Sequence, residues 1–185
     1  MSGLSYPLFF VAWFLFIIKA RATGEKIMEI VHVRIDERLV HAQVANAWVK
    51  ELGIERLVVI DGSAATDDTQ HQYLKMSCPK GCVLKILDTR QATEMLKEDD
   101  GEGEKALLLF RGPNNVMRLY NAGICFDEIT VGNLHTMDEP KTELTPSVVI
   151  SDEQKELFRQ IAEAGTKVYI QLAPDAEKTN LIDLL

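Results

Sequence analysis

The segment RLVVID, Arg56 to Asp61, decides the fold class of this chain. Its four central residues are all apolar and three of them are β-branched, which favours an extended strand. An unbroken apolar run suits a strand of a parallel sheet, because helices cover both faces of such a sheet. The segment therefore predicts a buried parallel strand, and the flanking sequence predicts what surrounds it.

Short apolar runs of this kind alternate along the chain with segments of helical periodicity. We expect strands at residues 30–34, 56–61, 82–87, 106–110, 127–132, 147–150 and 167–172. We expect helices at residues 42–52, 67–78, 89–97, 113–121, 151–164 and 174–185. For residues 135–145 we expect a mobile loop, or a hairpin that leads to an edge strand. The alternation predicts an α/β fold, with an open, mostly parallel sheet of about seven strands and helices on both faces.

Three helix ends carry recognisable signals. Gly53 is expected to end the first helix, because glycine adopts the left-handed conformation that closes helices. Thr66 is expected to cap the second helix. Ser151 begins the tetrapeptide Ser-Asp-Glu-Gln, which predicts an N-terminal cap with acidic residues in the first turn.

Charge and cysteine content exclude several classes of protein. The net charge of −8 argues against broad nucleic-acid binding, which requires a basic face. Cys78, Cys82 and Cys125 are odd in number and lack framework spacing, so we expect reduced thiols, no disulfides and no zinc site. No glycine-rich phosphate loop follows the first strand, which argues against nucleotide binding there, and the absence of a Gly-x-Ser-x-Gly motif argues against a hydrolase. We also expect no cofactor.

The N-terminus differs from the rest of the chain. Its apolar run PLFFVAWFLFII, Pro7 to Ile18, is shorter than the ~20 residues that span a bilayer. The run has the length of a signal-peptide core, and Ala20-Arg21-Ala22 is similar to a cleavage site. However, no basic residue precedes the apolar run, as one would in a signal peptide. Because Met28 directly precedes the first strand, we interpret residues 1–27 as an extension outside the fold and residues 28–185 as one domain, with a signal peptide as the alternative.

Polar residues follow several of the predicted strands. The carboxyl ends of parallel strands meet at one edge of an open sheet, where ligands bind. Residues of this kind are Asp36, Arg38, His41, Asp61, Ser63, Arg111, Asn114, Asn133 and His135.

The first of these loops has the most chemical potential. It lies within RIDERLVHAQV, Arg34 to Val44, and places His41 near the start of a helix. The positive end of a helix disfavours imidazolium, and a neutral imidazole is a nucleophile. Arg38 offers a charged fork that suits phosphate oxygens, and Asp36 would orient the ring or hold Arg38. The simpler alternative is a capping or half-buried histidine, with Arg38 in a salt bridge to Asp36 or Glu37.

The same stretch resembles the first loop of the IIB components of the mannose/fructose/sorbose family of the bacterial phosphoenolpyruvate-dependent sugar phosphotransferase system. That loop typically reads Arg-Ile-Asp-Asp-Arg-Leu-Ile-His-Gly-Gln-Val and is followed by a tryptophan, here Trp48. The resemblance continues in VVIDGSAATDD, LLLFRGPNNVMRL, DEITVGNLH and VYIQLAPD, so it covers residues 28–185.

The resemblance implies a function and a set of partners. His41 would accept a phosphoryl group from a phosphohistidine of a IIA protein or domain. It would pass the group to a sugar bound by the membrane subunits IIC and IID, with Arg38 and Asp36 as the other catalytic residues. The resemblance thus implies a cytoplasmic phosphotransferase, peripherally associated with its transporter. We expect the binding residues to be Arg34, Gln43, Ser63, Arg111 and Asn133.

Two positions depart from the family pattern. Ala42 stands where the family usually has Gly, and Glu37 stands where it usually has Asp. An alanine restricts the backbone wherever a positive φ is needed. A non-catalytic binding or regulatory module with the same fold and an anion pocket is therefore kept as an alternative. The segment VGNLH favours the N-acetylgalactosamine or galactosamine branch, although the sugar and any self-association are left open.

Overall fold

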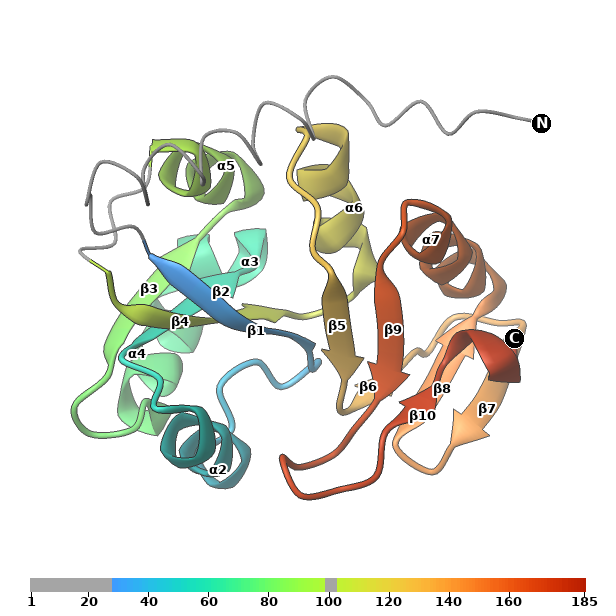
Figure 1. The fold of residues 1–185 in the computed structure, drawn as a ribbon, viewed down its shortest axis with the longest axis horizontal. Helices are drawn as coiled ribbons and strands as arrows, with labels where there is room; N and C mark the ends of the chain where they lie inside the picture. The colour runs from blue at the N-terminus through green and yellow to red at the C-terminus, as the bar shows by residue number, and fades with distance from the viewer. Residues whose placement is uncertain (1–27, 99–102) are drawn as a thin grey trace.

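The computed structural model describes residues 28–98 and 103–185, and its centre is a seven-stranded sheet (Figure 1). The strand order is β10-β9-β5-β1-β4-β2-β3. Six strands run parallel: β1 (Glu29–Ile35), β2 (Arg56–Ile60), β3 (Val83–Leu87), β4 (Lys105–Phe110), β5 (Glu128–Val131) and β9 (Lys167–Ile170). This confirms the predicted α/β class. The predicted N-terminal extension, residues 1–27, lies outside the described residues.

A second sheet of three strands, in the order β6-β8-β7, lies beside the first. Its strands are β6 (Leu134–His135), β7 (Lys141–Thr145) and β8 (Val148–Ser151). The strand expected at 147–150 is therefore present, but it belongs to this second sheet. β7 and β8 pair antiparallel, so the hairpin alternative for residues 135–145 is the one observed.

The expected helix at residues 174–185 is wrong. The side-chain amide of Gln171 donates to the carbonyl oxygens of Pro174 (3.2 Å) and Ala176 (3.0 Å), which stabilises a loop there. The chain then returns as β10 (Thr179–Asn180), which pairs antiparallel with β9. The only helical turn that follows in this described segment is the 3-10 helix η1 (Ile182–Leu184). Pairing with β9 thus replaces the helical hydrogen bonds.

Six α-helices occupy the described residues. They are α2 (Ala42–Leu52), α3 (Gly62–Thr66), α4 (Asp68–Ser77), α5 (Thr89–Glu98), α6 (Pro113–Asn121) and α7 (Asp152–Glu163). Gly53 ends α2 with φ 65°, and Ser151 forms a capping box with Gln154 at the start of α7, as expected. The cap expected at Thr66 is wrong. Asp67 is extended and accepts hydrogen bonds from the backbone N–H groups of Thr69 and Gln70, so Asp67 caps α4, the expected helix. Thr66 instead ends α3, a short helix that the sequence analysis did not expect.

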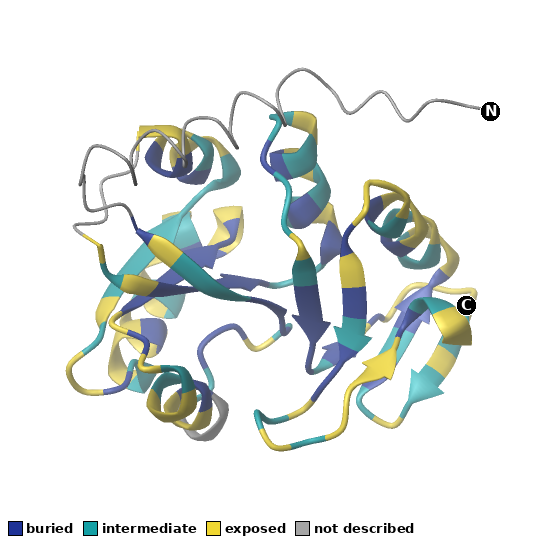
Figure 2. Ribbon diagram, in the orientation of Figure 1, coloured by how far each residue is buried: buried dark blue, intermediate teal, exposed yellow. Residues whose placement is uncertain are grey.

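The core forms one layer on each face of the main sheet. The inner strands β2, β4 and β5 are mostly buried, whereas the edge strand β10 is exposed (Figure 2). Side chains of β2 alternate between the layers: Leu57 and Val59 face one, Val58 and Ile60 the other. Helices α2, α3 and α4 cover the first layer, and α5, α6 and α7 cover the second. Each fully buried aliphatic side chain stabilises the fold by about 1.5–3 kcal/mol. Among the described helices, none combines the length and apolar character needed to cross a bilayer.

Candidate phosphorylation site

The loop from Asp36 to His41 leaves the carboxyl end of β1 through an unusual backbone turn. Leu39 has φ 56°, in the left-handed region that costs an L-residue roughly 1–2 kcal/mol. The side chains of Leu39 and Val40 are buried in the core beside α2, with 4% and 0% of their surface exposed. Burial of two aliphatic side chains, worth about 1.5–3 kcal/mol each, offsets that strain. The buried side chains of Leu39 and Val40 thus hold this turn against the core, and His41 follows directly after it.

His41 is the N-cap residue of α2. Its carbonyl oxygen accepts a hydrogen bond from the backbone N–H of Ala45 at 2.8 Å, and its own backbone is extended. Within the described part of the chain, the imidazole makes no capping hydrogen bond and its buried Nδ1 has no partner. The side chain is half-buried, but it does not cap the helix. Among the described residues, neither a helix-capping hydrogen bond nor a hydrogen bond at Nδ1 therefore holds the imidazole in place.

Asp36 holds the arginine of the loop. The carboxylate is 1% exposed. Its Oδ1 accepts hydrogen bonds from two groups of Arg38, the backbone N–H at 3.2 Å and the side-chain Nε at 3.1 Å. Its Oδ2 accepts from Arg38 at 3.3 Å and from Arg34 at 3.2 Å. The hydrogen bond to Asp36 raises the pKa of Arg38 above its usual value, so the guanidinium stays charged. Of the two roles considered for Asp36, these contacts match the one that holds Arg38, whose side chain remains 39% exposed.

Arg34 lies in the interior rather than at the surface of the site. It is 1% exposed and donates to the carbonyl oxygens of Gln171 (2.8 Å) and Leu172 (3.3 Å). The guanidinium lies over the Trp48 ring, 5.4 Å from its centroid. Burial lowers the pKa of Arg34, and the neighbouring Asp36 opposes this effect. This environment connects the first loop to the segment after β9 and keeps Arg34 away from an incoming ligand.

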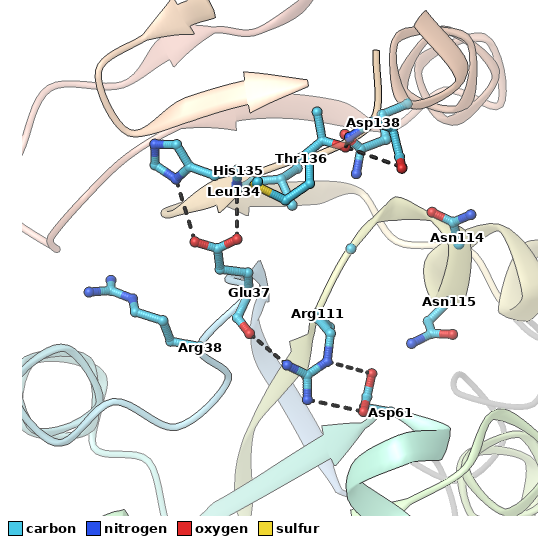
Figure 3. A pocket seen from close by; sticks show the side chains of 13 residues that line it. Glu37, Arg38, Asp61, Arg111, Asn114, Asn115, Leu134, His135, Thr136 and Asp138 are labelled. Atoms are coloured by element: carbon cyan, nitrogen blue, oxygen red, sulfur yellow. Dashed lines mark hydrogen bonds and ion pairs between the residues drawn. The ribbon is translucent and has the colours of Figure 1, made fainter. Parts of the chain in front are cut away.

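Arg111, at the end of β4, joins three other parts of the chain, and Figure 3 shows its contacts with two of them, Asp61 and Glu37. It donates to both carboxylate oxygens of Asp61 at 3.0 and 3.2 Å, and to the side-chain oxygen of Gln70 at 2.9 Å. It also donates to the carbonyl oxygen of Glu37 at 3.0 Å. Asp61 in turn caps α3 by accepting from the backbone N–H of Ala64 at 2.9 Å. Arg111 therefore fixes the first loop relative to the loop after β2.

An open pocket of about 610 Å³ lies beside Arg38 and Arg111 (Figure 3). Arg38 and Arg111 line it on the side of the first loop. The opposite wall comes from α6, α7 and the residues around β6, and its members are Asn114, Asn115, Gln154, Leu134, His135, Thr136, Met137 and Asp138. His41 is not among the lining residues. Sequence reasoning identified Asn114 and His135 but missed most of this wall, because the packing of the second sheet against the first brings it there.

The remaining expected binding residues are spread more widely. Asn133 reaches the first loop, where its side-chain amide donates to the carboxylate of Glu37. Ser63 is exposed on α3 and is not among the residues that line the pocket. Gln43 is the second residue of α2, and its side chain lies outside the described residues. Of the expected residues, Asp36 and Arg38 thus lie in the first loop, and Asn133 contacts it. Ser63 lies apart from the pocket beside that loop.

Two other expectations concern the surroundings of the loop. Ala42 is the first residue of α2, where the backbone is helical, so the position favours alanine over glycine. His32 is structural: its ring stacks on Trp48 with centroids 4.1 Å apart, and its Nε2 lies 2.9 Å from the hydroxyl of Thr130. Burial lowers the pKa of His32 to about 3. In the described ranges, no three side chains of His, Cys, Asp or Glu are grouped to hold a metal ion.

Comparison with known proteins identifies the family. The family model described as the PTS system sorbose subfamily IIB component matches residues 30–185. The chain is 30% identical over 151 residues to the N-acetylgalactosamine-specific phosphotransferase enzyme IIB component 1 of Escherichia coli, covering 81% of this chain and 94% of that protein. It is 27% identical over 152 residues to the mannose-specific EIIAB component of Escherichia coli, covering 82% of this chain. This chain spans 47% of that longer protein.

Solved structures agree with this assignment. The N-acetylgalactosamine-specific IIB component 1 of Escherichia coli superposes with a TM-score of 0.77 at 29% identity, covering 83% of this chain and 99% of that chain. The IIBSor domain of the sorbose permease from Klebsiella pneumoniae shares the fold, with a TM-score of 0.79 at 22% identity over 85% of this chain and 96% of that chain. The resemblance seen in the first loop is thus confirmed, and the chain belongs to the sorbose subfamily of IIB components of the phosphotransferase system.

Proposed function

We propose that residues 28–185 form one phosphocarrier domain, which accepts a phosphoryl group on His41 and passes it to a sugar during import. The observation that carries this proposal is the geometry of the first loop. His41 is half-buried, its imidazole does not cap α2, and it follows an arginine that Asp36 holds in place. A histidine with this freedom is available as a nucleophile, and the charged fork of the arginine three residues before it suits phosphate oxygens.

The transfer follows from these groups. A ring nitrogen of neutral His41 attacks phosphorus, and the nitrogen–phosphorus bond to the donor histidine breaks as the new bond forms. Phosphoryl transfer depends mainly on positioning and on stabilisation of charge on the equatorial oxygens. Arg38 supplies the positive charge, while Asp36 and the buried Arg34 fix its orientation. In the second step the oxygen of a sugar hydroxyl attacks phosphorus and the nitrogen–phosphorus bond to His41 breaks. The proton that the hydroxyl loses balances the proton that the released imidazole takes up.

The partners in this proposal are a IIA phosphodonor and membrane subunits IIC and IID, which place the protein at the cytoplasmic face of the membrane. The mannose-specific relative is named as an EIIAB component, which supports a IIA donor. The relative with 30% identity is named as N-acetylgalactosamine-specific, which makes this amino sugar the first substrate to test. Association of this chain with itself is compatible with the proposal but is not required by it.

The test is phosphopeptide mapping after incubation with a phosphorylated IIA protein. We expect acid-labile, base-stable phosphate on the peptide that contains His41 and none in His41→Ala. His71→Ala, a histidine on α4, serves as the matched control and should be labelled like the wild type. If His41→Ala accepts the same phosphate, the proposal is wrong. If His41 is labelled but no sugar phosphate forms in membranes that contain IIC and IID, the chain is a binding or regulatory module.

A further inference from the structure

Glu37 makes more connections than any role as a solvated loop residue requires. Its backbone N–H donates to the carbonyl oxygen of Asn133 at 2.8 Å, and its carbonyl oxygen accepts from Arg111 at 3.0 Å. Its carboxylate accepts from the side-chain amide of Asn133 and from the backbone N–H of His135 at 3.0 Å. Figure 3 shows this carboxylate directed at His135, whose Nδ1 lies 3.4 Å from Oε1. Glu37 thus forms hydrogen bonds with residues 133–135 through both its backbone and its side chain.

We propose that Glu37 is a positioning residue: it fixes the loop that carries His41 against residues 133–135, and this requires the reach of a glutamate. The inference rests on the proposed function of His41. His135 belongs to β6, so this one carboxylate connects the first loop of the main sheet to the second sheet. An aspartate is one methylene shorter and would not make both contacts without displacing the loop.

The backbone of the loop explains why such a connection is needed. The left-handed turn at Leu39 lies between Glu37 and His41, and a non-glycine residue keeps that conformation only where its surroundings impose it. The buried side chains of Leu39 and Val40 hold the loop from the side of the core. Glu37 holds it from the opposite end through hydrogen bonds to an ionised acceptor, which are stronger than neutral ones. Loss of either restraint would let His41 leave its position.

The experiment measures the phosphorylation rate of the full chain with two donors. Phosphoramidate is small and tests His41 without a protein interface, and a phosphorylated IIA protein tests the assembled reaction. We expect Glu37→Asp and Glu37→Ala to lower the rate at saturating donor by roughly tenfold or more with both donors, because small displacements of reacting groups lower rates steeply. Glu37→Gln, which keeps the length and one acceptor oxygen, should lose less. Glu163→Asp, at an exposed position on α7, is the matched control and should equal the wild type.

Two further measurements separate positioning from a loss of folding. Circular dichroism should show all variants folded at the assay temperature, while the ¹H–¹⁵N signals of the His41 ring should shift or broaden in Glu37→Asp but not in Glu163→Asp. In a double-mutant cycle, Asn133→Ala should add little to the effect of Glu37→Asp, since both remove the same connection.

The outcomes distinguish this inference from the function on which it rests. If Glu37→Asp and Glu37→Ala phosphorylate like the wild type while His41→Ala does not, the inference is wrong and the proposed function stands. A raised KM for the IIA protein with an unchanged rate at saturation also overturns it, because Glu37 would then contact the donor. If His41→Ala accepts phosphate at the wild-type rate, the proposed function itself fails.

Discussion

Gly132 lies so close to Arg34 that a Cβ atom there would come within 1.7 Å of the guanidinium nitrogen. The same atom would lie 2.8 Å from a carboxylate oxygen of Asp36. The backbone at the end of β5 therefore packs directly against the buried ion pair below the first loop. Glycine is needed here for close approach, since the larger neighbours are fixed by their own hydrogen bonds.

We expect Gly132→Ala to destabilise the protein by about 1–3 kcal/mol, the usual effect of forcing extra volume into a packed interior. Urea unfolding followed by circular dichroism measures the change. Gly62→Ala is the matched control, because a Cβ at Gly62 meets nothing within 4 Å, and it should change stability by less than about 0.5 kcal/mol. Equal stability of the two variants would show that Arg34 moves away easily.

Arg34→Met should lower the free energy of unfolding by about 3–5 kcal/mol, the range for breaking a buried ion pair by removing one partner. The carboxylate of Asp36 would lose a partner, and two backbone carbonyl oxygens would lose their donor. Chemical denaturation tests this. Arg90→Met removes an exposed arginine from an ion pair with Glu94 and should cost no more than about 0.5 kcal/mol. A comparable small effect at Arg34 would contradict its assignment as a central structural residue.

Arg38→Lys should slow phosphorylation of His41 by roughly 10²-fold, while the unfolding midpoint changes little. Lysine keeps the charge but cannot pair with Asp36 through a planar fork, so Asp36 no longer fixes the position of the charge that would stabilise the phosphoryl group. Single-turnover labelling with a phosphorylated IIA protein gives the rate. Arg90→Lys, on the exposed surface of α5, should label at the wild-type rate. Wild-type labelling of Arg38→Lys would exclude a geometric role for the guanidinium.

His32 should make the protein sensitive to mild acid. Burial lowers its pKa from 6.5 to about 3, so it stays neutral in the folded state while the unfolded chain binds a proton below pH 6.5. The unfolded state then binds more protons, and stability falls as the pH falls, by up to about 1.4 kcal/mol per pH unit. Between pH 6.5 and 4.5, where most carboxylates stay ionised, His32→Gln should show a shallower loss of stability than the wild type. Parallel pH profiles for the two proteins would contradict the shift.

The sequence determined much of the local structure and the alternation of strands and helices along the chain. Local residues account for one strand and two helix ends. These residues are the apolar run 56–61, the glycine after α2 and the serine before α7, and each acts over only a few positions of the chain. RIDERLVHAQV likewise placed His41 at the start of a helix, three residues after an arginine.

Only the tertiary structure decided which distant segments meet. Strand pairing with β9 replaced the helix expected at 174–185, and packing of the second sheet supplied most of one pocket wall. Arg34 resembles a ligand-binding residue in the sequence, yet it is buried because Gly132, Trp48 and the carbonyl oxygens after β9 surround it. Gly132 lies 98 positions from Arg34, and Gln171 and Leu172 lie 137 and 138 positions from it. The free energy of such long-range contacts depends on the packed fold rather than on any local pattern.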